Sequence, residues 1–284
     1  MTVDAPSSLH PRLRRLVKTA SDRWNKLGDE AQFYVNTVKS IPDAVINYRA
    51  ELLRLIAATG LGTGALVVVG GTVAIVGFLT MTTGALVAIQ GYNQFSSVGF
   101  EALTGFASAF LNVRMIVPAT TAVALSATIG AGATAQIGAM RINEEIDALE
   151  VIGIRSITYL ASTRVLAATV VVIPLYCVAV MTAFLAARLG TTTVYGQGAG
   201  VYDHYFNTFL NPDDLIWSFV QCVAITVVIM LVHTYFGFTA SGGPAGVGEA
   251  VGGAVRLSMV IAAVEIVFIS LAIYGQTGNF NMAG

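Results

Sequence analysis

The chain has 284 residues, of which 55% are hydrophobic and only 11% are charged, whereas an ordinary soluble domain carries about 25% charged residues. This composition excludes a soluble globular protein and indicates an all-α integral membrane protein. The net charge of −1 says little, but nine of the 15 Lys and Arg residues lie before residue 55, and all three lysines are among them. The chain therefore has a basic end followed by a long apolar body.

The basic end is predicted to form two parts. Residues 1–39 form a basic, cytoplasmic N-terminal region, because such clusters are typical of a cytoplasmic face near anionic lipid rather than of nucleic-acid binding in a membrane protein. Residues 40–61 predict an interfacial helix, with Ser40 as its N-cap, Pro42 in its first turn and Asp43 three residues after the cap.

Five apolar runs are each long enough to cross a bilayer, which takes about 20 residues. They cover about 62–90, 115–138, 165–187, 214–236 and 254–275. Residues 95–113 predict a short helix that does not span, residues 189–213 a polar loop, and residues 276–284 a tail. The whole of 62–275 is expected to be one five-span domain.

The distribution of basic residues orients these spans. With a cytoplasmic N-terminus, the cytoplasmic segments are 1–61, 139–164 and 237–253, and they hold nine, three and no basic residues. This pattern obeys the positive-inside rule. We therefore expect a multi-pass protein of the plasma membrane, with its C-terminus on the extracytoplasmic side.

A stripe of small residues runs along the second span. Ser126, Gly130, Thr134 and Gly138 recur at every fourth position, a spacing that allows close approach between membrane helices. Packing within the chain is the favoured interpretation, and an interface with a partner subunit is the alternative.

The charged stretch between the second and third spans predicts a short amphipathic helix over 140–153. Its apolar face holds Ile142, Ile146, Leu149 and Ile152, and its other face holds Asn143, Glu144, Asp147 and Glu150. Arg141 and Glu145 lie four residues apart and are expected to pair, and Gly153 supplies a C-cap. The helix is either a connector along the bilayer interface or a coupling helix held by a cytoplasmic motor.

Few residues suggest chemistry within the chain itself. No lysine follows Lys39, so a phosphate-binding P-loop is excluded, and the two cysteines have no partners at zinc-ligand spacing. Glu265 lies deep in a predicted span, which suggests either a functional acid or a locally hydrogen-bonded, neutral one. It leaves a proton-coupled secondary transporter as the alternative function, whereas no nucleophile–base pair indicates an enzyme.

Several segments carry a family resemblance. MRINEEIDALEVIGI (140–154), STRVLA (162–167), GALVAIQGY (84–92) and GPAGVGEAVGGAV (243–255) resemble the MlaE/YrbE permeases in the right order, over roughly residues 45–275. The basic N-terminal extension is most similar to actinobacterial (mycobacterial) YrbE subunits of Mce systems, and the B-type is favoured. Arg155-Ser156 stands where many relatives have Asp-Pro, and Gln136 stands where an acid is common.

The resemblance implies a non-catalytic, five-span permease subunit of an ATP-driven importer of lipid, either fatty or mycolic acid, sterol or phospholipid. It implies three kinds of partner: a second YrbE permease in a heterodimer, a cytoplasmic P-loop ATPase, and extracytoplasmic Mce proteins. ATP and Mg would be bound by the ATPase, so no cofactor is expected in this chain. The residues expected to contact the ATPase are Arg141, Glu144, Glu145, Asp147 and Glu150.

Overall fold

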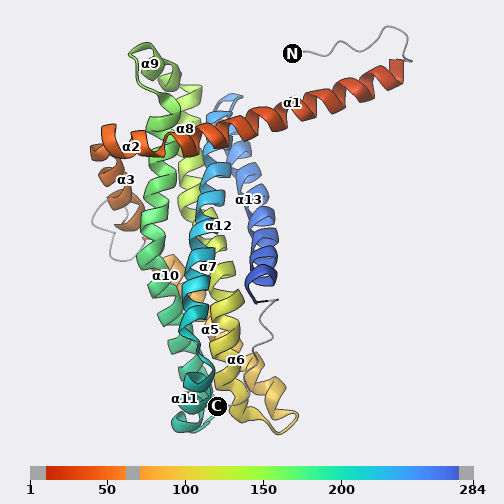
Figure 1. Ribbon diagram of the computed structural model, residues 1–284, viewed down its shortest axis with the longest axis vertical. Coiled ribbons are helices and arrows are strands. Elements are labelled where there is room, and N and C mark those ends of the chain that lie inside the picture. The colour runs from red at the N-terminus through yellow and green to blue at the C-terminus, as the bar shows by residue number, and fades with distance from the viewer. Residues whose placement is uncertain (1–10, 62–70, 275–284) are drawn as a thin grey trace.

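In the computed structural model, residues 11–61 and 71–274 are described, and every regular element in them is a helix (Figure 1). Five helical stretches are long and apolar enough to cross a membrane, as predicted from the sequence. They are Thr72–Ser96, Glu101–Ile142, Ile157–Val194, Pro212–Phe238 and Gly243–Ile273.

The first span is α5 (Thr72–Ser96). It extends past the predicted end at residue 90, whereas the predicted start at residue 62 lies outside the described residues. Gln90, Asn93 and Gln94 are accommodated on its surface, because polar side chains do not interrupt a helix whose backbone hydrogen bonds are made internally. The chain turns only at Gly99, which has a φ of 78°.

The second span is one unbroken helical stretch. A 3₁₀ turn, η1 (Glu101–Leu103), leads into α6 (Thr104–Leu111), α7 (Val117–Leu125) and α8 (Ala131–Ile142), which are joined by the π segments η2 (Asn112–Ile116) and η3 (Ser126–Gly130). The short helix predicted at 95–113 is therefore not separate from the span. Its central part is α6, which continues into the membrane.

The third span consists of η4 (Ile157–Ser162), α10 (Thr163–Leu189) and η5 (Gly190–Val194), and the last two are α12 (Pro212–Phe238) and α13 (Gly243–Tyr274). The polar loop predicted at 189–213 is wrong in part, because α11 (Ala199–Phe209) forms there. Tyr202 is only 1% exposed, and this buried anchor explains why a polar segment packs as a helix against α6.

The core lies where α5, α7, α10 and α12 meet. Val76, Val172, Leu175 and Ile225 are among its fully buried side chains. Gly84 allows α5 and α10 to touch, since a Cβ there would lie 2.4 Å from the carbonyl oxygen of Ala183. The bundle is thus built around α10.

Three helices precede the bundle: α1 (Pro11–Lys39), α2 (Ile41–Asn47) and α3 (Arg49–Leu61). Figure 1 shows α1 lying across one end of the bundle and extending beyond it. The single helix predicted over 40–61 is wrong, because the chain breaks at Tyr48. Ser40 holds the N-cap position of α2, as predicted, but its hydroxyl accepts no hydrogen bond from that helix and instead donates back to the carbonyl of Asn36 at 2.8 Å.

Candidate coupling surface

The charged stretch forms a separate short helix, α9 (Glu145–Val151), which projects from the end of the bundle crossed by α1 and α2 (Figure 1). The helix predicted over 140–153 is therefore interrupted. α8 ends at Ile142, and Glu144 has a φ of 59°, the one positive φ of a non-glycine residue in the part of the chain that the structure describes. Left-handed backbone is unfavourable for residues with a Cβ and is often found at functional sites.

The other end of α9 is closed by Gly153, as predicted. Gly153 has a φ of 83°, its N–H donates to Glu150 O at 3.0 Å, and the N–H of Ile154 donates to Leu149 O at 3.0 Å. These two bonds form a Schellman motif, which satisfies carbonyls at the helix end. The motif reverses the chain and returns it to the bundle.

One apolar side chain fixes α9 to the bundle. Ile146 is 1% exposed and packs with Ile137 and Leu160, and Leu149 packs partly against the same cluster. The prediction that Ile152 shares this face is wrong. Val151 and Ile152 are 87% and 71% exposed, since the chain leaves the helix there.

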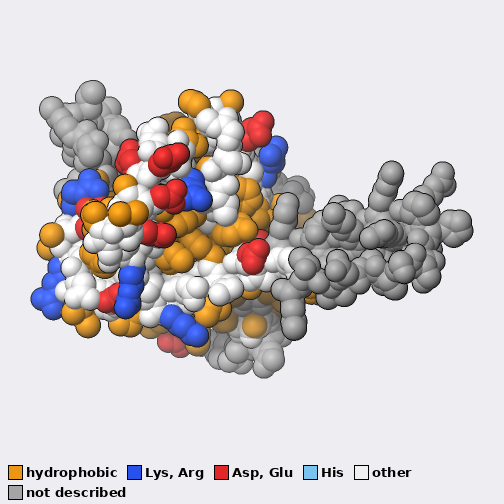
Figure 2. Space-filling model, turned by 90° about the horizontal axis from the view of Figure 1, so that it is seen from above, with side chains coloured by type: hydrophobic (Ala, Val, Ile, Leu, Met, Phe, Trp, Pro, Cys, Tyr) orange, Lys and Arg blue, Asp and Glu red, His pale blue; other side chains and the backbone are white. Residues whose placement is uncertain are grey.

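The acidic side chains of α9 and the turn before it are exposed. Glu144, Glu145 and Asp147 are exposed, and they lie on the end of the molecule where Figure 2 shows charged and apolar side chains side by side. Glu150 is exposed as well, and it accepts a hydrogen bond from the hydroxyl of Ser156. All four predicted acids therefore lie exposed on α9 and the turn before it, and Glu150 also binds the segment that follows the helix.

Arg141 pairs with a partner other than the predicted one. Its Nη1 lies 2.7 Å from Oδ1 of Asp147, whereas the four-residue spacing to Glu145 holds only in a continuous helix. The break at Asn143 and Glu144 changes that geometry. The ion pair holds α9 across the turn that precedes it.

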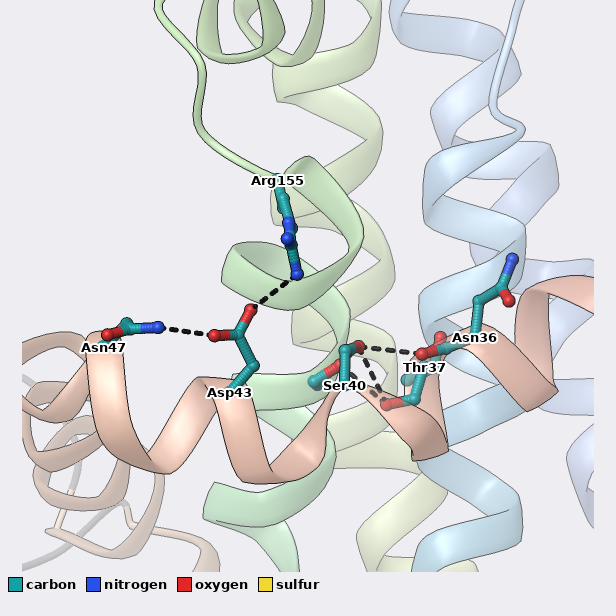
Figure 3. Close-up of polar contacts among 7 residues, drawn as sticks. Asn36, Thr37, Ser40, Asp43, Asn47 and Arg155 are labelled. Carbon is teal, nitrogen blue, oxygen red and sulfur yellow. Dashed lines mark hydrogen bonds and ion pairs between the residues drawn. The ribbon is translucent and has the colours of Figure 1, made fainter.

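The segment after α9 is bound to the junction between α1 and α2 (Figure 3). Arg155 Nη1 lies 3.2 Å from Oδ2 of Asp43, the hydroxyl of Ser162 donates to Thr37 O at 2.8 Å, and the hydroxyls of Ser40 and Ser162 are 2.8 Å apart. Sequence reasoning missed these contacts, because they join residues more than 110 positions apart. They connect α9 mechanically to the N-terminal helices.

The small-residue stripe of the second span faces α12 and α13 of the same chain. Ser126 and Thr134 hydrogen-bond to the ring of His233, and a Cβ at Gly130 would lie 2.5 Å from that ring. A Cβ at Gly138 would meet side chains at 3.1 Å and 3.3 Å. None of the four residues belongs to the surface of α9.

Glu265 lies apart from α9, on α13. It is half-buried, and its Oε2 has no hydrogen-bond partner among the described residues. Within the same residues, no three His, Cys, Asp or Glu side chains are grouped to hold a metal ion.

The five spans, the projecting α9 and the N-terminal helices define the class: a multi-pass helical membrane protein with a charged helix at one end. A family model described as Permease MlaE matches residues 62–272, which is most of the chain. The chain belongs to the MlaE permease family. The match begins after α3, so the three N-terminal helices lie outside it.

Individual relatives share less than 30% of their residues with this chain. A "Protein TRIGALACTOSYLDIACYLGLYCEROL 1, chloroplastic" of Arabidopsis thaliana is 27% identical over 183 residues, which are 64% of this chain and 52% of that protein. A "Probable ABC transporter permease protein" of Rickettsia bellii is 29% identical, covering 66% and 72% of the two chains. One of Synechocystis is 24% identical, covering 69% and 74%. The alignment thus spans about half of the plant relative.

Proposed function

We propose that the chain is the membrane-spanning permease subunit of an ATP-driven lipid transporter and that α9 is its coupling helix. Membership of the MlaE permease family supports the permease role, and the names of the bacterial relatives support a transporter of the ABC class. ATP and Mg would be bound by a separate P-loop ATPase, and this chain would catalyse no reaction itself.

One observation carries the assignment. α9 has exposed acidic side chains and, at its C-terminal end, exposed apolar side chains, while Ile146 anchors the helix to the bundle. Glu144, Glu145 and Asp147 offer charge that orients a basic partner and speeds its association. Val151 and Ile152 offer apolar area that a partner would bury. Ile146 holds the helix in place, so movement of α9 would be passed to α8 and to the segment bound to α1 and α2.

The finer identity is also a proposal. The resemblance of the N-terminal extension to actinobacterial YrbE proteins supports a mycobacterial Mce importer in the plasma membrane, in which this chain is the B-type subunit. Its partners would be a second YrbE permease, with which it forms a heterodimer in the membrane, and Mce proteins on the extracytoplasmic side. The cargo would be fatty or mycolic acid, sterol or phospholipid, and the N-terminal helices would lie at the cytoplasmic interface.

Co-purification tests the proposal. The tagged chain is extracted from its native membrane in mild detergent, and its associated proteins and lipids are identified by mass spectrometry. We expect a second permease, a P-loop ATPase, Mce proteins and retained lipid. In the variant Glu144→Lys/Glu145→Lys/Asp147→Lys, the ATPase should be lost while the second permease stays.

The matched control is Glu101→Lys, which reverses an exposed acid at the opposite end of the bundle and should keep the ATPase. Retention of the ATPase by the α9 variant, or its absence from the wild-type complex after crosslinking at residue 145, would contradict the coupling role.

One observation favours a second candidate function. Oε2 of Glu265 has no hydrogen-bond partner among the described residues. An acid in a membrane span is energetically costly and is usually found there for a function, such as carrying protons in a proton-coupled secondary transporter. This carrier needs no ATPase, and transport measurements separate it from the favoured proposal.

A further inference from the structure

A cavity of about 310 Å³ lies at the bundle face where α3 approaches α5, α8 and α10. Its lining residues include the apolar Leu55, Ile75 and Met230, and they also include Arg54 and Arg164. No carboxylate is among the described residues that line it. The cavity wall therefore combines apolar surface with positively charged side chains.

Arg164 is the unusual member of this wall. It is only 7% exposed, and it forms none of the ion pairs found among the described residues. Nη1 donates to Leu160 O at 2.9 Å, and Nη2 donates to Oε1 of Gln136 at 3.4 Å. Nε has no acceptor in the part of the chain that is described.

Among the described residues, the buried guanidinium of Arg164 lacks the anionic partner that a purely structural arginine would have. A buried charge is normally paired, and a guanidinium left with neutral acceptors retains most of its desolvation penalty. Arg54, at the same wall, is already paired with Glu51 at 2.6 Å. The Glu51 carboxylate hydrogen-bonds to Arg54 and acts on Arg164 only through longer-range electrostatics, so the guanidinium of Arg164 keeps N–H groups that have no acceptor among the described residues.

We propose that this cavity binds the anionic headgroup of a lipid, with Arg164 as the recognition residue. A phosphate or carboxylate oxygen would accept from the guanidinium of Arg164, whose N–H donors outnumber its acceptors among the described residues, since planar guanidinium groups suit such oxygens. The apolar wall would contact the start of an acyl chain. The site is separate from α9 and goes beyond the proposed coupling role, since lipid binding here requires neither an ATPase nor transport.

Gly132 provides a way to block the cavity without touching Arg164. It lines the wall, and a Cβ at this position meets no atom within 4 Å. A leucine would therefore extend into the empty space. Gly252 of α13 also has open space at its Cβ position but does not line the cavity, which makes Gly252→Leu the matched control.

The test is native mass spectrometry of the purified full-length chain from nanodiscs of equal dioleoylphosphatidylglycerol and dioleoylphosphatidylcholine. We expect the wild type and Gly252→Leu to retain phosphatidylglycerol preferentially. Arg164→Gln should lower that retention about tenfold, the effect of losing a charge-assisted hydrogen bond, and Arg164→Lys should restore part of it. Gly132→Leu should lower retention at least as much, because its side chain would occupy the space of the lipid.

Two outcomes would overturn the proposal. Equal retention of the two lipids by the wild type excludes a headgroup site, and unchanged phosphatidylglycerol retention in Gly132→Leu places the lipid elsewhere, even where Arg164→Gln fails to fold. A parallel arm adds inorganic phosphate alone. Thermal stabilisation by phosphate that depends on Arg164, without lipid retention, would assign the anion site to free phosphate and reject the lipid.

Discussion

His233 shows how single residues hold the spans together. It is fully buried, with Nδ1 lying 2.8 Å from the hydroxyl of Thr134 and Nε2 lying 3.1 Å and 3.2 Å from those of Ser126 and Ser258. Both ring nitrogens therefore have hydroxyl partners, which come from the second span and from α13. The ring fits because Gly130 leaves space beside it.

Gly130→Ala should destabilise the protein by about 1–3 kcal/mol, because the added methyl would lie 2.5 Å from the ring of His233 and overpacks a fixed group. Thermal unfolding in detergent measures the change. Gly132→Ala is the control, since it lies two residues away on the same stretch with nothing within 4 Å, and it should be neutral or slightly stabilising. Equal effects from the two substitutions would reject this account of the packing.

Some residue roles were readable from the sequence and others were not. Gly153 follows a short amphipathic run, so its role as the helix end could be predicted from local chemistry. The partners of Ser126 and Arg164 could not, because His233 and the cavity wall come from other spans. The spacing of residues along one helix predicts which of them share a face, but it does not predict which residues of other helices pack against that face.

At the scale of the element, α9 is a short helix fixed at both ends. A break at Glu144 starts it, Ile146 attaches it to the bundle, and the turn at Gly153 ends it. The sequence pattern predicted the helix and its end, but it placed the start five residues early and extended the apolar face to Ile152. Periodicity alone cannot show a left-handed residue such as Glu144, which no glycine marks.

Gly153→Ala should loosen α9 selectively. Its Cβ would meet no atom within 4 Å, so the penalty is the left-handed backbone, about 1–2 kcal/mol. Hydrogen exchange of the amides in 145–152 should quicken about tenfold or more, while the spans stay protected. Gly28→Ala, on α1 and also in open space, should leave the exchange of α9 unchanged; faster exchange there too would reject a local effect.

At the scale of the whole molecule, the two ends of the bundle differ. α9 and the N-terminal helices lie at one end and α11 lies at the other (Figure 1). The number of spans was predictable because about 20 apolar residues mark each one. The form of the ends was not, since α11 depends on the burial of Tyr202 against α6.

Cysteine labelling in intact cells tests the proposed orientation. Single cysteines replace Glu145 in α9 and Thr208 in α11, both exposed, in a chain whose native Cys177 and Cys222 are changed to alanine. A membrane-impermeant maleimide should label the residue-208 variant in intact cells, and the residue-145 variant only after permeabilisation. The reverse pattern would place α9 outside the cell, beyond the reach of a cytoplasmic ATPase.

The most direct measurement of the central claim is lipid transport by the reconstituted complex, in proteoliposomes supplied with ATP or with a proton gradient. We expect transport to need ATP, to continue in Glu265→Gln, and to stop when Glu144, Glu145 and Asp147 are changed to lysine. The Glu101→Lys control should transport normally. Transport that is driven by the proton gradient, lost in Glu265→Gln and retained by the α9 variant would contradict the ATP-driven permease and support the carrier.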